Sequence, residues 1–384
     1  MRTDFDVAVV GAGPAGSWTA FRLAEAGARV ALIDGSHPRE KPCGGGVTGR
    51  AFALVDGALA TASLPVVSVA TATFSAAGRR AVVTIAQPAR TAGGLGIVSR
   101  REFDRALLAA ATKAGAHHLP HRVVALERTS LGWQVGAGDN RMSCAWLVGA
   151  DGVSSFVRRH VSAPFPRAEL SVATGYFVQG HASTQADVDF DDAPTGYVWA
   201  FPRVDHLAVG ACGQADAASS PSLLARAKRW IDAHVPHRAS LDRYSWPIPS
   251  LGERALGAEV PAGDRWLLVG DAAGLVDPIT REGIYFALLS GEHAARTLQQ
   301  GSTAAEYTRR LRDTAFAELV RAAHLKARFF RPELLALLVS GLERSQGVRA
   351  IMADLISGNQ TYAGLRRRLL GTFELRLMLE FLRL

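Results

Sequence analysis

Six residues near the start of the chain have the types and spacing needed to hold a pyrophosphate and a ribose. An apolar run over residues 6–10 has the β-branched content of a buried parallel strand, and a glycine-rich turn follows it. Gly11 allows the tight turn, Gly13 lets the backbone approach a pyrophosphate, and Gly16 lets a helix pack closely on the strand. The carboxylate of Asp34, at the end of a second strand, can accept from a ribose hydroxyl. This unit is predicted to bind the ADP half of a dinucleotide through Gly11, Gly13, Pro14, Ala15, Gly16 and Asp34.

A cysteine followed by three glycines, over residues 43–46, is the second segment with chemical potential. Consecutive glycines lose too much backbone entropy to sustain a helix or strand, so they indicate backbone passing close to something bulky and flat. Gly44 and Gly45 are therefore assigned to the cofactor site. Cys43 is either a reactive thiol near a redox centre or a small buried residue, and the second alternative is favoured because free cysteines are usually core residues.

Several polar residues stand where a strand gives way to a helix. Asp151 follows an apolar strand over 146–150 and Asp271 follows another over 265–270, at the strand ends where open α/β sheets bind ligands. Arg100 begins a helix and is well placed for a diphosphate, with a solvated surface arginine as the alternative. A helix starting near Gly283 would point its amides at the ligand and stabilise an anionic reduced ring.

Residues 166–258 have the pattern of an antiparallel sheet, with strand-like segments separated by turns. Tyr197, Trp199 and Phe201 occupy alternate positions of one strand, so their side chains project from one face. Such a row is either ordinary core or the wall of a pocket for a flat ring or a long apolar substrate.

Composition restricts the classes of protein that fit. The 384 residues carry 43 Lys and Arg against 35 Asp and Glu, a net charge of +8 that suggests an anionic cofactor or a membrane surface, and no nucleic-acid motif is present. Three widely spaced cysteines form neither a disulfide framework nor a zinc site, and His117, His118 and His121 lack the partners of a metal site. No apolar run could span a bilayer, and the chain starts directly with a strand, leaving no room for a signal peptide. These features predict a cytoplasmic protein without metal.

The elements that must position these residues predict an α/β fold, α+β overall. It combines a Rossmann-like nucleotide-binding domain with an antiparallel-sheet substrate domain and a C-terminal helical region. A helix is expected over 17–26, and a pair of strands over 63–90. The predicted nucleotide-binding domain is discontinuous, over residues 1–62, 91–165 and 259–301. The substrate domain takes 63–90 and 166–258, and the helical region takes 302–384.

Five segments together resemble the geranylgeranyl reductase family, within the wider group of hydroxylase-type FAD enzymes. They are residues 11–34, 42–46, 149–152, 194–202 and 270–284. The first, third and fifth are shared with hydroxylases and halogenases, whereas the cysteine-triglycine and Tyr-x-Trp-x-Phe-Pro segments resemble the reductase branch. The resemblance implies FAD as cofactor and a fold of the kind described above.

The resemblance also implies roles for individual residues. Arg100 would contact the FAD diphosphate, Asp271 the diphosphate–ribityl region, and the amides of Gly283 and Ile284 the flavin pyrimidine. Further cofactor contacts are assigned to Val124, Asp151, Gly270 and Pro278. Cys43 would lie near the flavin, and Cys43, Tyr197 and Trp199 are the candidate catalytic residues. Phe201, Pro202 and Arg281 are assigned to the substrate cavity.

One position departs from the family pattern. Arg281 stands in Arg-Glu-Gly-Ile where the family commonly has Gly-Glu-Gly-Ile, which places a bulky cation beside the flavin edge. Its side chain would point outward, or contact an anionic substrate or the flavin itself.

Two kinds of redox chemistry fit these residues. The first is reduction of a prenyl C=C bond by hydride from reduced FAD, on a prenyl diphosphate, prenylated lipid or prenylquinone. The second is a monooxygenase or halogenase-like reaction on an aromatic ring, free or on a peptide; an FAD-stabilised binding protein is a disfavoured third. With one dinucleotide fingerprint, electrons must arrive from NAD(P)H or another donor, including an electron-donor protein.

The C-terminal region reads as helices only, with a basic stretch at 366–368 before an apolar one. It is predicted to dock on the core, to rest on anionic lipid as a peripheral membrane contact, or to cap the substrate tunnel.

Overall fold

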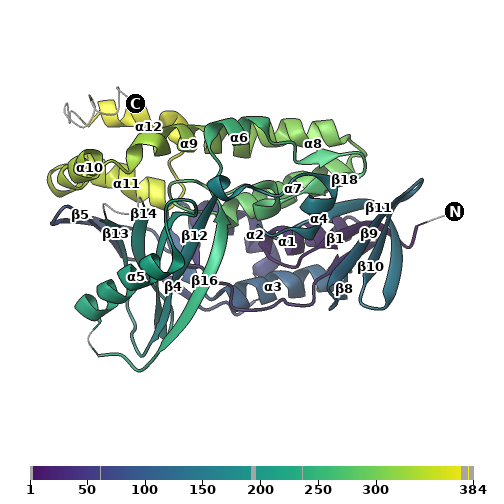
Figure 1. The fold of residues 1–384 in the computed structure, drawn as a ribbon, viewed down its shortest axis with the longest axis horizontal. Helices are drawn as coiled ribbons and strands as arrows, with labels where there is room; N and C mark the ends of the chain where they lie inside the picture. The colour runs from purple at the N-terminus through teal and green to yellow at the C-terminus, as the bar shows by residue number, and fades with distance from the viewer. Residues whose placement is uncertain (1–2, 61, 192–195, 236, 373–378, 380–384) are drawn as a thin grey trace.

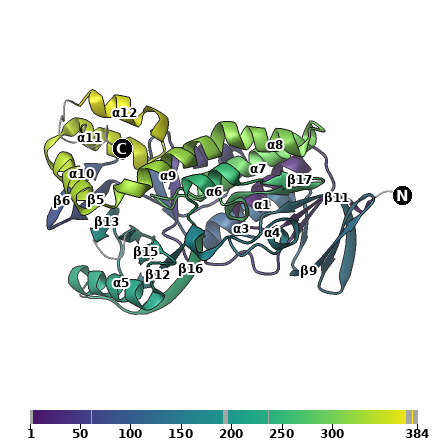
Figure 2. The ribbon, with the colours of Figure 1, turned by 45° about the horizontal axis from the view of Figure 1, so that its top comes forward.

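The computed structural model describes residues 3–60, 62–191, 196–235, 237–372 and 379 (Figure 1). Two large β-sheets lie next to each other along the long axis of the molecule, and the C-terminal helices run across the top of both (Figures 1 and 2). The first sheet contains the predicted nucleotide-binding unit, and the second contains the aromatic row. The predicted combination of a Rossmann-like domain, a second sheet and a helical region is confirmed.

The first sheet has eight strands, in the order β17-β18-β11-β1-β2-β8, with β9 and β10 forming an antiparallel extension beside β11. The central pairings of β1 with β2 and β11, of β2 with β8, and of β11 with β18 are parallel. Apolar side chains fill both faces, as expected of a covered parallel sheet. The strands are β1 (Phe5–Val10), β2 (Val30–Ile33), β8 (His117–Leu119), β9 (Val123–Thr129), β10 (Gly132–Ala137), β11 (Asn140–Gly149), β17 (Ala262–Gly263) and β18 (Trp266–Leu268).

Helices cover this sheet and connect its strands. Helix α1 packs against both α3 and α7. It begins at Pro14, three residues before the predicted start, because proline is pre-organised for the first helical position. The helices of this part are α1 (Pro14–Glu25), α2 (Gly49–Leu59), α3 (Arg100–Lys113), α4 (Phe156–Val161), α6 (Glu253–Ala258) and α7 (Ile284–Gln299).

Gly11 and Gly16 of the first turn stand where a side chain would meet backbone. Gly11 has φ +104°, and a Cβ there would lie 2.4 Å from the carbonyl oxygen of Ala150. A Cβ at Gly16 would lie only 1.8 Å from the carbonyl oxygen of Gly11. Both contacts are with backbone, which cannot move aside, so the β1–α1 turn requires glycine at both positions.

The second sheet has seven strands in the order β16-β12-β15-β14-β13-β5-β6. The strands within residues 166–258 pair antiparallel, as expected, whereas β13 runs parallel to β5, which comes from residues 63–90. No hairpin links these two strands, which are about a hundred residues apart in sequence, so no turn imposes an antiparallel direction. The strands are β5 (Thr71–Ala76), β6 (Arg79–Thr84), β12 (Leu170–Gln179), β13 (Gln185–Asp191), β14 (Gly196–Pro202), β15 (His206–Gln214) and β16 (Leu241–Pro249).

Residues 63–90 contain three strands rather than the predicted pair. Two of them, β5 and β6, belong to the second sheet. The strand that precedes them, β4 (Val66–Ser68), belongs instead to a small antiparallel sheet with β3 (Gly46–Thr48) and β7 (Leu95–Val98). Since β3 begins with the last glycine of the cysteine-glycine segment, this small sheet fixes the end of that segment between the two large sheets.

The two faces of the second sheet have different coverings. Helix α5 (Ser220–His234) packs on one face against Val198, Ala200 and Val209. The alternate residues of β14 face the other way, toward the helices that follow residue 302. This alternation has the two-residue period expected of a strand buried on both faces.

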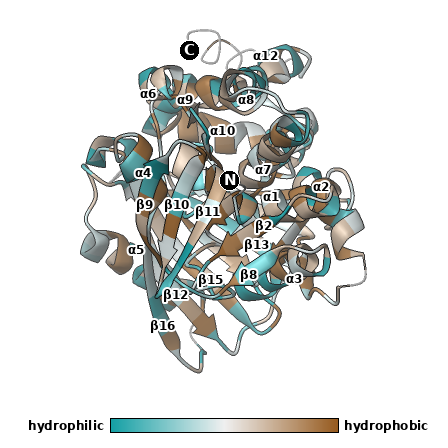
Figure 3. Cartoon of the chain, turned by 90° about the vertical axis from the view of Figure 1, so that its right-hand side faces the viewer, coloured by the Kyte–Doolittle hydropathy of each residue, from teal (hydrophilic) through white to brown (hydrophobic). Residues whose placement is uncertain are grey.

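The described part of residues 302–372 is helical, as predicted. It contains α8 (Ala304–Leu311), a π-helical turn (Arg312–Phe316), α9 (Ala317–Phe329), α10 (Pro332–Arg344), α11 (Gln346–Ile356) and α12 (Tyr362–Leu370). These helices carry hydrophilic and hydrophobic stretches side by side (Figure 3), and α10 buries Leu334, Leu338 and Leu342. Most of the predicted membrane-contacting helix lies outside the described residues. Among the helices that are described, none has the length and apolar character needed to cross a membrane.

Candidate functional site

The carboxylate of Asp34 lies at the mouth of the glycine-rich turn. Its Oδ2 accepts from the Ala12 amide at 2.8 Å, and its Oδ1 accepts from the Ser36 amide at 2.6 Å. Burial alone raises the pKa of Asp34, but hydrogen bonds from His37 and these amides outweigh it and hold the pKa well below its ordinary value. Asp34 is therefore an ionised acceptor, as ribose binding requires.

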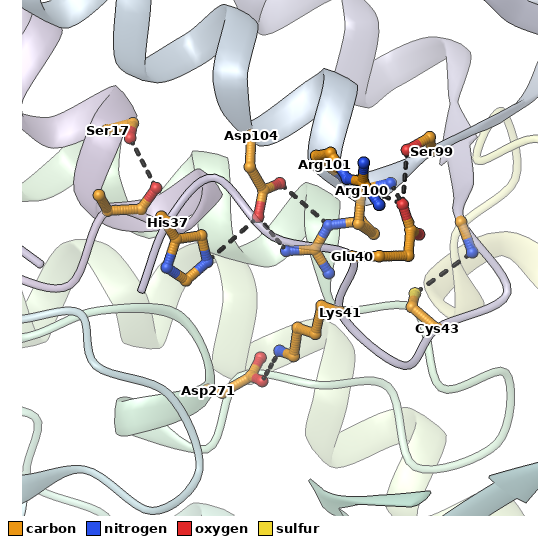
Figure 4. A network of polar contacts seen from close by, with 12 residues as sticks. Ser17, His37, Glu40, Lys41, Cys43, Ser99, Arg100, Arg101, Asp104 and Asp271 are labelled. Carbon is orange, nitrogen blue, oxygen red and sulfur yellow. Dashed lines mark hydrogen bonds and ion pairs between the residues drawn. The ribbon is translucent and has the colours of Figure 1, made fainter. Parts of the chain in front are cut away.

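A buried ionic network extends from Asp34 to Arg100, and Figure 4 shows the part from His37 through Asp104 to Arg100. His37 places Nδ1 2.8 Å from Asp34 Oδ2 and Nε2 3.3 Å from Asp104 Oδ2. Asp104, fully buried, accepts from Arg100 Nε at 3.0 Å and Nη2 at 2.9 Å. Sequence reasoning named both ends of this network but missed His37 and Asp104, although the four-residue spacing of Arg100 and Asp104 on a helix was a usable signal.

Cations and a helix terminus surround the middle of the site. Arg100 lines the cavity described below, and Lys41, also missed from the sequence, donates to Asp271 at 2.9 Å on its wall. Gly283 and Ile284 line the same cavity at the start of α7, whose positive dipole end faces it. This charge arrangement suits a diphosphate and an electron-rich ring.

The cysteine-glycine segment runs against the aromatic row. A Cβ at Gly44 would lie 2.6 Å from the Phe201 ring, and one at Gly45 would lie 2.3 Å from the Val98 carbonyl oxygen and 2.6 Å from the Arg203 guanidinium. Arg203, 2% exposed, donates from Nη2 to the Cys43 carbonyl at 3.0 Å. Cys43 itself lines the cavity, and its sulfur accepts from the Gly45 amide at 3.3 Å. The glycines therefore allow the backbone to pass between the cofactor site and bulky side chains.

Tyr197, Trp199 and Phe201 all line the cavity from β14. The Tyr197 hydroxyl donates to the Thr280 carbonyl at 2.7 Å, which joins the sheet to the loop before α7. Burial raises the pKa of Tyr197 well above its ordinary value, so the hydroxyl stays protonated.

One cavity of about 290 Å³ joins these parts. At one end it is lined by the polar residues just described, and elsewhere by apolar side chains of the second sheet and of α9 to α12. The apolar lining includes Phe74, Phe190, Phe329, Leu338, Ile351 and Leu365. The sequence offered capping of the substrate tunnel by these helices as one of three alternatives, because an apolar helix face that lines a cavity has the same pattern as one that packs on a core.

Several assigned residues do not reach the cavity with their side chains. Asp151 instead caps α4, accepting from the amides of Phe156 at 2.6 Å and Val157 at 3.1 Å. Val124 is 59% exposed on β9. The other assigned residues outside the lining are Gly11, Gly13, Ala15, Gly16, Asp34, Pro202, Gly270 and Pro278; Gly11 to Gly16 and Asp34 form the turn beside it.

Arg281 has a left-handed backbone, with φ +63°. This explains why glycine suits the position, since left-handed backbone strains any other residue. The side chain lines the cavity, and its Nη1 donates to the Ser250 hydroxyl at 2.6 Å.

A glycine-rich β-α-β turn, an ionised carboxylate at the mouth of that turn, a cationic middle and an adjoining apolar cavity define a dinucleotide-dependent oxidoreductase. The residues fit FAD: the turn has room for no side chain at Gly11 or Gly16, and the buried cations and the α7 amides match the charge of the diphosphate and flavin.

Comparison with known proteins agrees with this class. Residues 4–298 match the FAD binding domain family. The chain is 32% identical over 329 residues to a menaquinone reductase of Mycolicibacterium smegmatis, covering 78% of each chain. It is 30% identical over 308 residues to a geranylgeranyl diphosphate reductase of Rhodobacter capsulatus, covering 76% of this chain and 74% of that protein.

The fold also matches a geranylgeranyl bacteriochlorophyll reductase-like protein from Thermoplasma acidophilum, with a TM-score of 0.77 and 22% identity over 96% of this chain and 99% of that one. The chain belongs to the geranylgeranyl reductase family of FAD-dependent oxidoreductases.

Proposed function

We propose that this protein reduces C=C bonds of a prenyl lipid or prenylquinone. The observation that carries the proposal is the single cavity that joins the dinucleotide site to an apolar chamber built from the aromatic row and four C-terminal helices. Such a chamber suits a long isoprenoid chain, because it replaces water around the chain with apolar contacts.

FAD, when bound and reduced, supplies a hydride for one alkene carbon, and a proton adds to the neighbouring carbon. The electrons come from NAD(P)H or another reductant by transient contact. The chain itself holds the cofactor through the glycine turn, Asp34 and Arg100. Tyr197, Trp199 and Phe201 orient the isoprenoid and exclude water, and Cys43 presents a thiol on the cavity wall that can hold the proton.

The test is anaerobic stopped-flow reoxidation of the reduced protein. A geranylgeranyl lipid should reoxidise the flavin, whereas its saturated phytanyl analogue should not. No reoxidation by any unsaturated prenyl lipid, together with oxygen-dependent product formation from an aromatic compound, would overturn the proposal in favour of a monooxygenase.

Two variants on one helix test whether the chamber holds the lipid. Ile351→Trp fills the cavity from α11, and Ala350→Trp places the same ring on the exposed face of that helix. We expect the first to slow reoxidation by lipid while reoxidation by oxygen is kept. The second should leave both rates unchanged. Equal behaviour of the two variants would show that the chamber is not the lipid site.

A further inference from the structure

Two positive side chains meet behind one wall of the cavity. Arg281, from the loop before α7, and Lys326, from α9, both donate to the Ser250 hydroxyl oxygen, at 2.6 and 2.8 Å. Lys326 also donates to Gln214 Oε1 at 2.8 Å. The acceptors that join the two cations are thus neutral, and Ser250 is itself 1% exposed.

Neither cation has an ion-pair partner among the residues that the structure describes. Glu169 and Asp216 act on Lys326 only from a distance, and burial together with the charge of Arg281 lowers the pKa of Lys326 to about 8. Arg281 Nε is buried with no hydrogen-bond partner in the described chain. Buried charges are normally paired, because an uncompensated charge in a partly dry site is costly.

The left-handed backbone of Arg281 indicates that its side chain has a use. Glycine would relieve the left-handed conformation, yet the chain keeps an arginine whose side chain reaches the cavity wall. Arg281 also donates from Nη1 to the Pro278 carbonyl oxygen in its own loop, and neither this contact nor the link to Ser250 needs a second cation beside it. Arg281 lines the cavity, and Lys326 lies behind it on the other side of the Ser250 hydroxyl. This pair, with one spare buried donor on Arg281, fits an anion that enters with the ligand.

We propose that Arg281 and Lys326 form an anion subsite that binds the phosphoryl head group of the prenyl substrate. This inference rests on the proposed prenyl reduction and narrows its substrate class. A quinone head group would leave both positive charges uncompensated, whereas a diphosphate offers several acceptor oxygens to Arg281 and Lys326. Arg281 and Lys326 are thereby specificity residues that act on the head group.

The first arm of the test measures binding without reduction. Inorganic diphosphate is titrated calorimetrically into the oxidised FAD-bound protein and its variants Arg281→Gly and Lys326→Gln. Hydrogen bonds to charged groups predict at least about tenfold weaker binding in each variant. Arg281→Gly removes backbone strain, so a folding defect is not expected there. Arg321→Gln, an exposed position on α9, is the matched control and should bind as the wild type does.

The second arm compares geranylgeranyl diphosphate with geranylgeraniol as oxidants of the reduced protein. We expect the wild type to prefer the diphosphate at least about tenfold in apparent Kd, and Arg281→Gly to lose that preference while still reducing the alcohol. Unchanged diphosphate binding in both variants would overturn the subsite. Binding that the variants lose, without any preference for the prenyl diphosphate, would assign the site to a free anion and refute the head-group role. If neither prenyl compound is reduced but the variants lose diphosphate binding, the proposed function fails and the anion site stands.

Discussion

Replacing Asp104 by Asn tests the network that joins the ribose end of the site to the diphosphate end. The substitution keeps the size of the side chain and removes one charge from a pair in which Asp104 is 0% and Arg100 3% exposed. It also exchanges one of the two acceptor oxygens that face Arg100 for a donor. Removing one partner of a buried ion pair costs about 3 to 5 kcal/mol, because the other charge remains buried and unpaired.

The FAD-free and FAD-bound proteins should respond differently. Arg100 lines the cavity, so the FAD diphosphate can supply part of the counter-charge that Asp104 no longer provides. We expect a loss of about 3 to 5 kcal/mol in the free energy of unfolding of the FAD-free protein. With FAD bound, the loss should be smaller by about 1.5 kcal/mol or more, the contribution of one hydrogen bond to a charged group.

Urea unfolding followed by circular dichroism, with and without saturating FAD, measures both quantities. Glu102→Gln is the matched control on the same helix, because the pair of Glu102 with Arg105 is solvent-exposed and contributes less than about 1 kcal/mol. An equal loss in both forms would show that Arg100 does not face the diphosphate. A loss no greater than that of the control would refute the reasoning on the buried pair itself.

Three further predictions concern the cofactor and the cavity wall. Gly16→Ala should lower FAD affinity about tenfold or more, measured by flavin absorbance, because its Cβ would overlap backbone and overpacking costs about 1 to 3 kcal/mol. The control Gly57→Ala, which has open space around it, should retain FAD in that assay. Burial disfavours protonation of His37, but the carboxylates of Asp104 and Asp34 outweigh it and raise the His37 pKa. The stabilisation of the folded protein by protonated His37 is therefore full below about pH 6.5, and it is lost as the pH rises through the folded-state pKa. The difference in unfolding free energy between wild type and His37→Gln should accordingly shrink from about pH 6 to about pH 9. Cys43→Ser should slow flavin reoxidation by the lipid about a hundredfold or more while FAD content is kept, and loss of FAD instead would contradict a role in proton transfer.

The sequence was most informative where a constraint is local. The β1–α1 turn could be predicted because the G-x-G-x-x-G spacing lies within one β-α-β unit, and a Cβ at Gly16 would meet the Gly11 backbone of the same turn. The backbone that a Cβ at Gly11 would meet, that of Ala150, follows β11 and is distant in sequence. The alternation of Tyr197, Trp199 and Phe201 likewise follows from strand geometry alone. Cys43 lies on the cavity wall, although the residue type alone favours a place in the core. The position of a free cysteine thus depends on the surrounding structure and not on its residue type.

Features that depend on contacts between distant elements could not be predicted in the same way. His37 follows Asp34 closely in sequence, but its contact with Asp104 comes from a helix more than sixty residues later. The parallel pairing of β13 with β5 and the helical wall of the cavity also arise only when separate parts of the chain meet. The positive φ of Arg281 explains the family's glycine, yet its acceptor Ser250, just after β16, and the second cation on that acceptor, Lys326 on α9, are distant in sequence.

The loop before α7 connects the substrate chamber to the cofactor site mechanically. Buried Asp277 accepts from the Ile279 and Thr280 amides through Oδ1, and from the Tyr362 hydroxyl on α12 through Oδ2 at 2.8 Å. On the other side, the Tyr197 hydroxyl holds the Thr280 carbonyl. The loop is therefore fixed by the aromatic row and by the last described helix, the two walls of the chamber. Because the same loop leads into the amides at the start of α7, these few hydrogen bonds hold the two chamber walls and the α7 amides in one arrangement. The proposed reduction, which requires approach within about 3.5 Å, would depend on that arrangement.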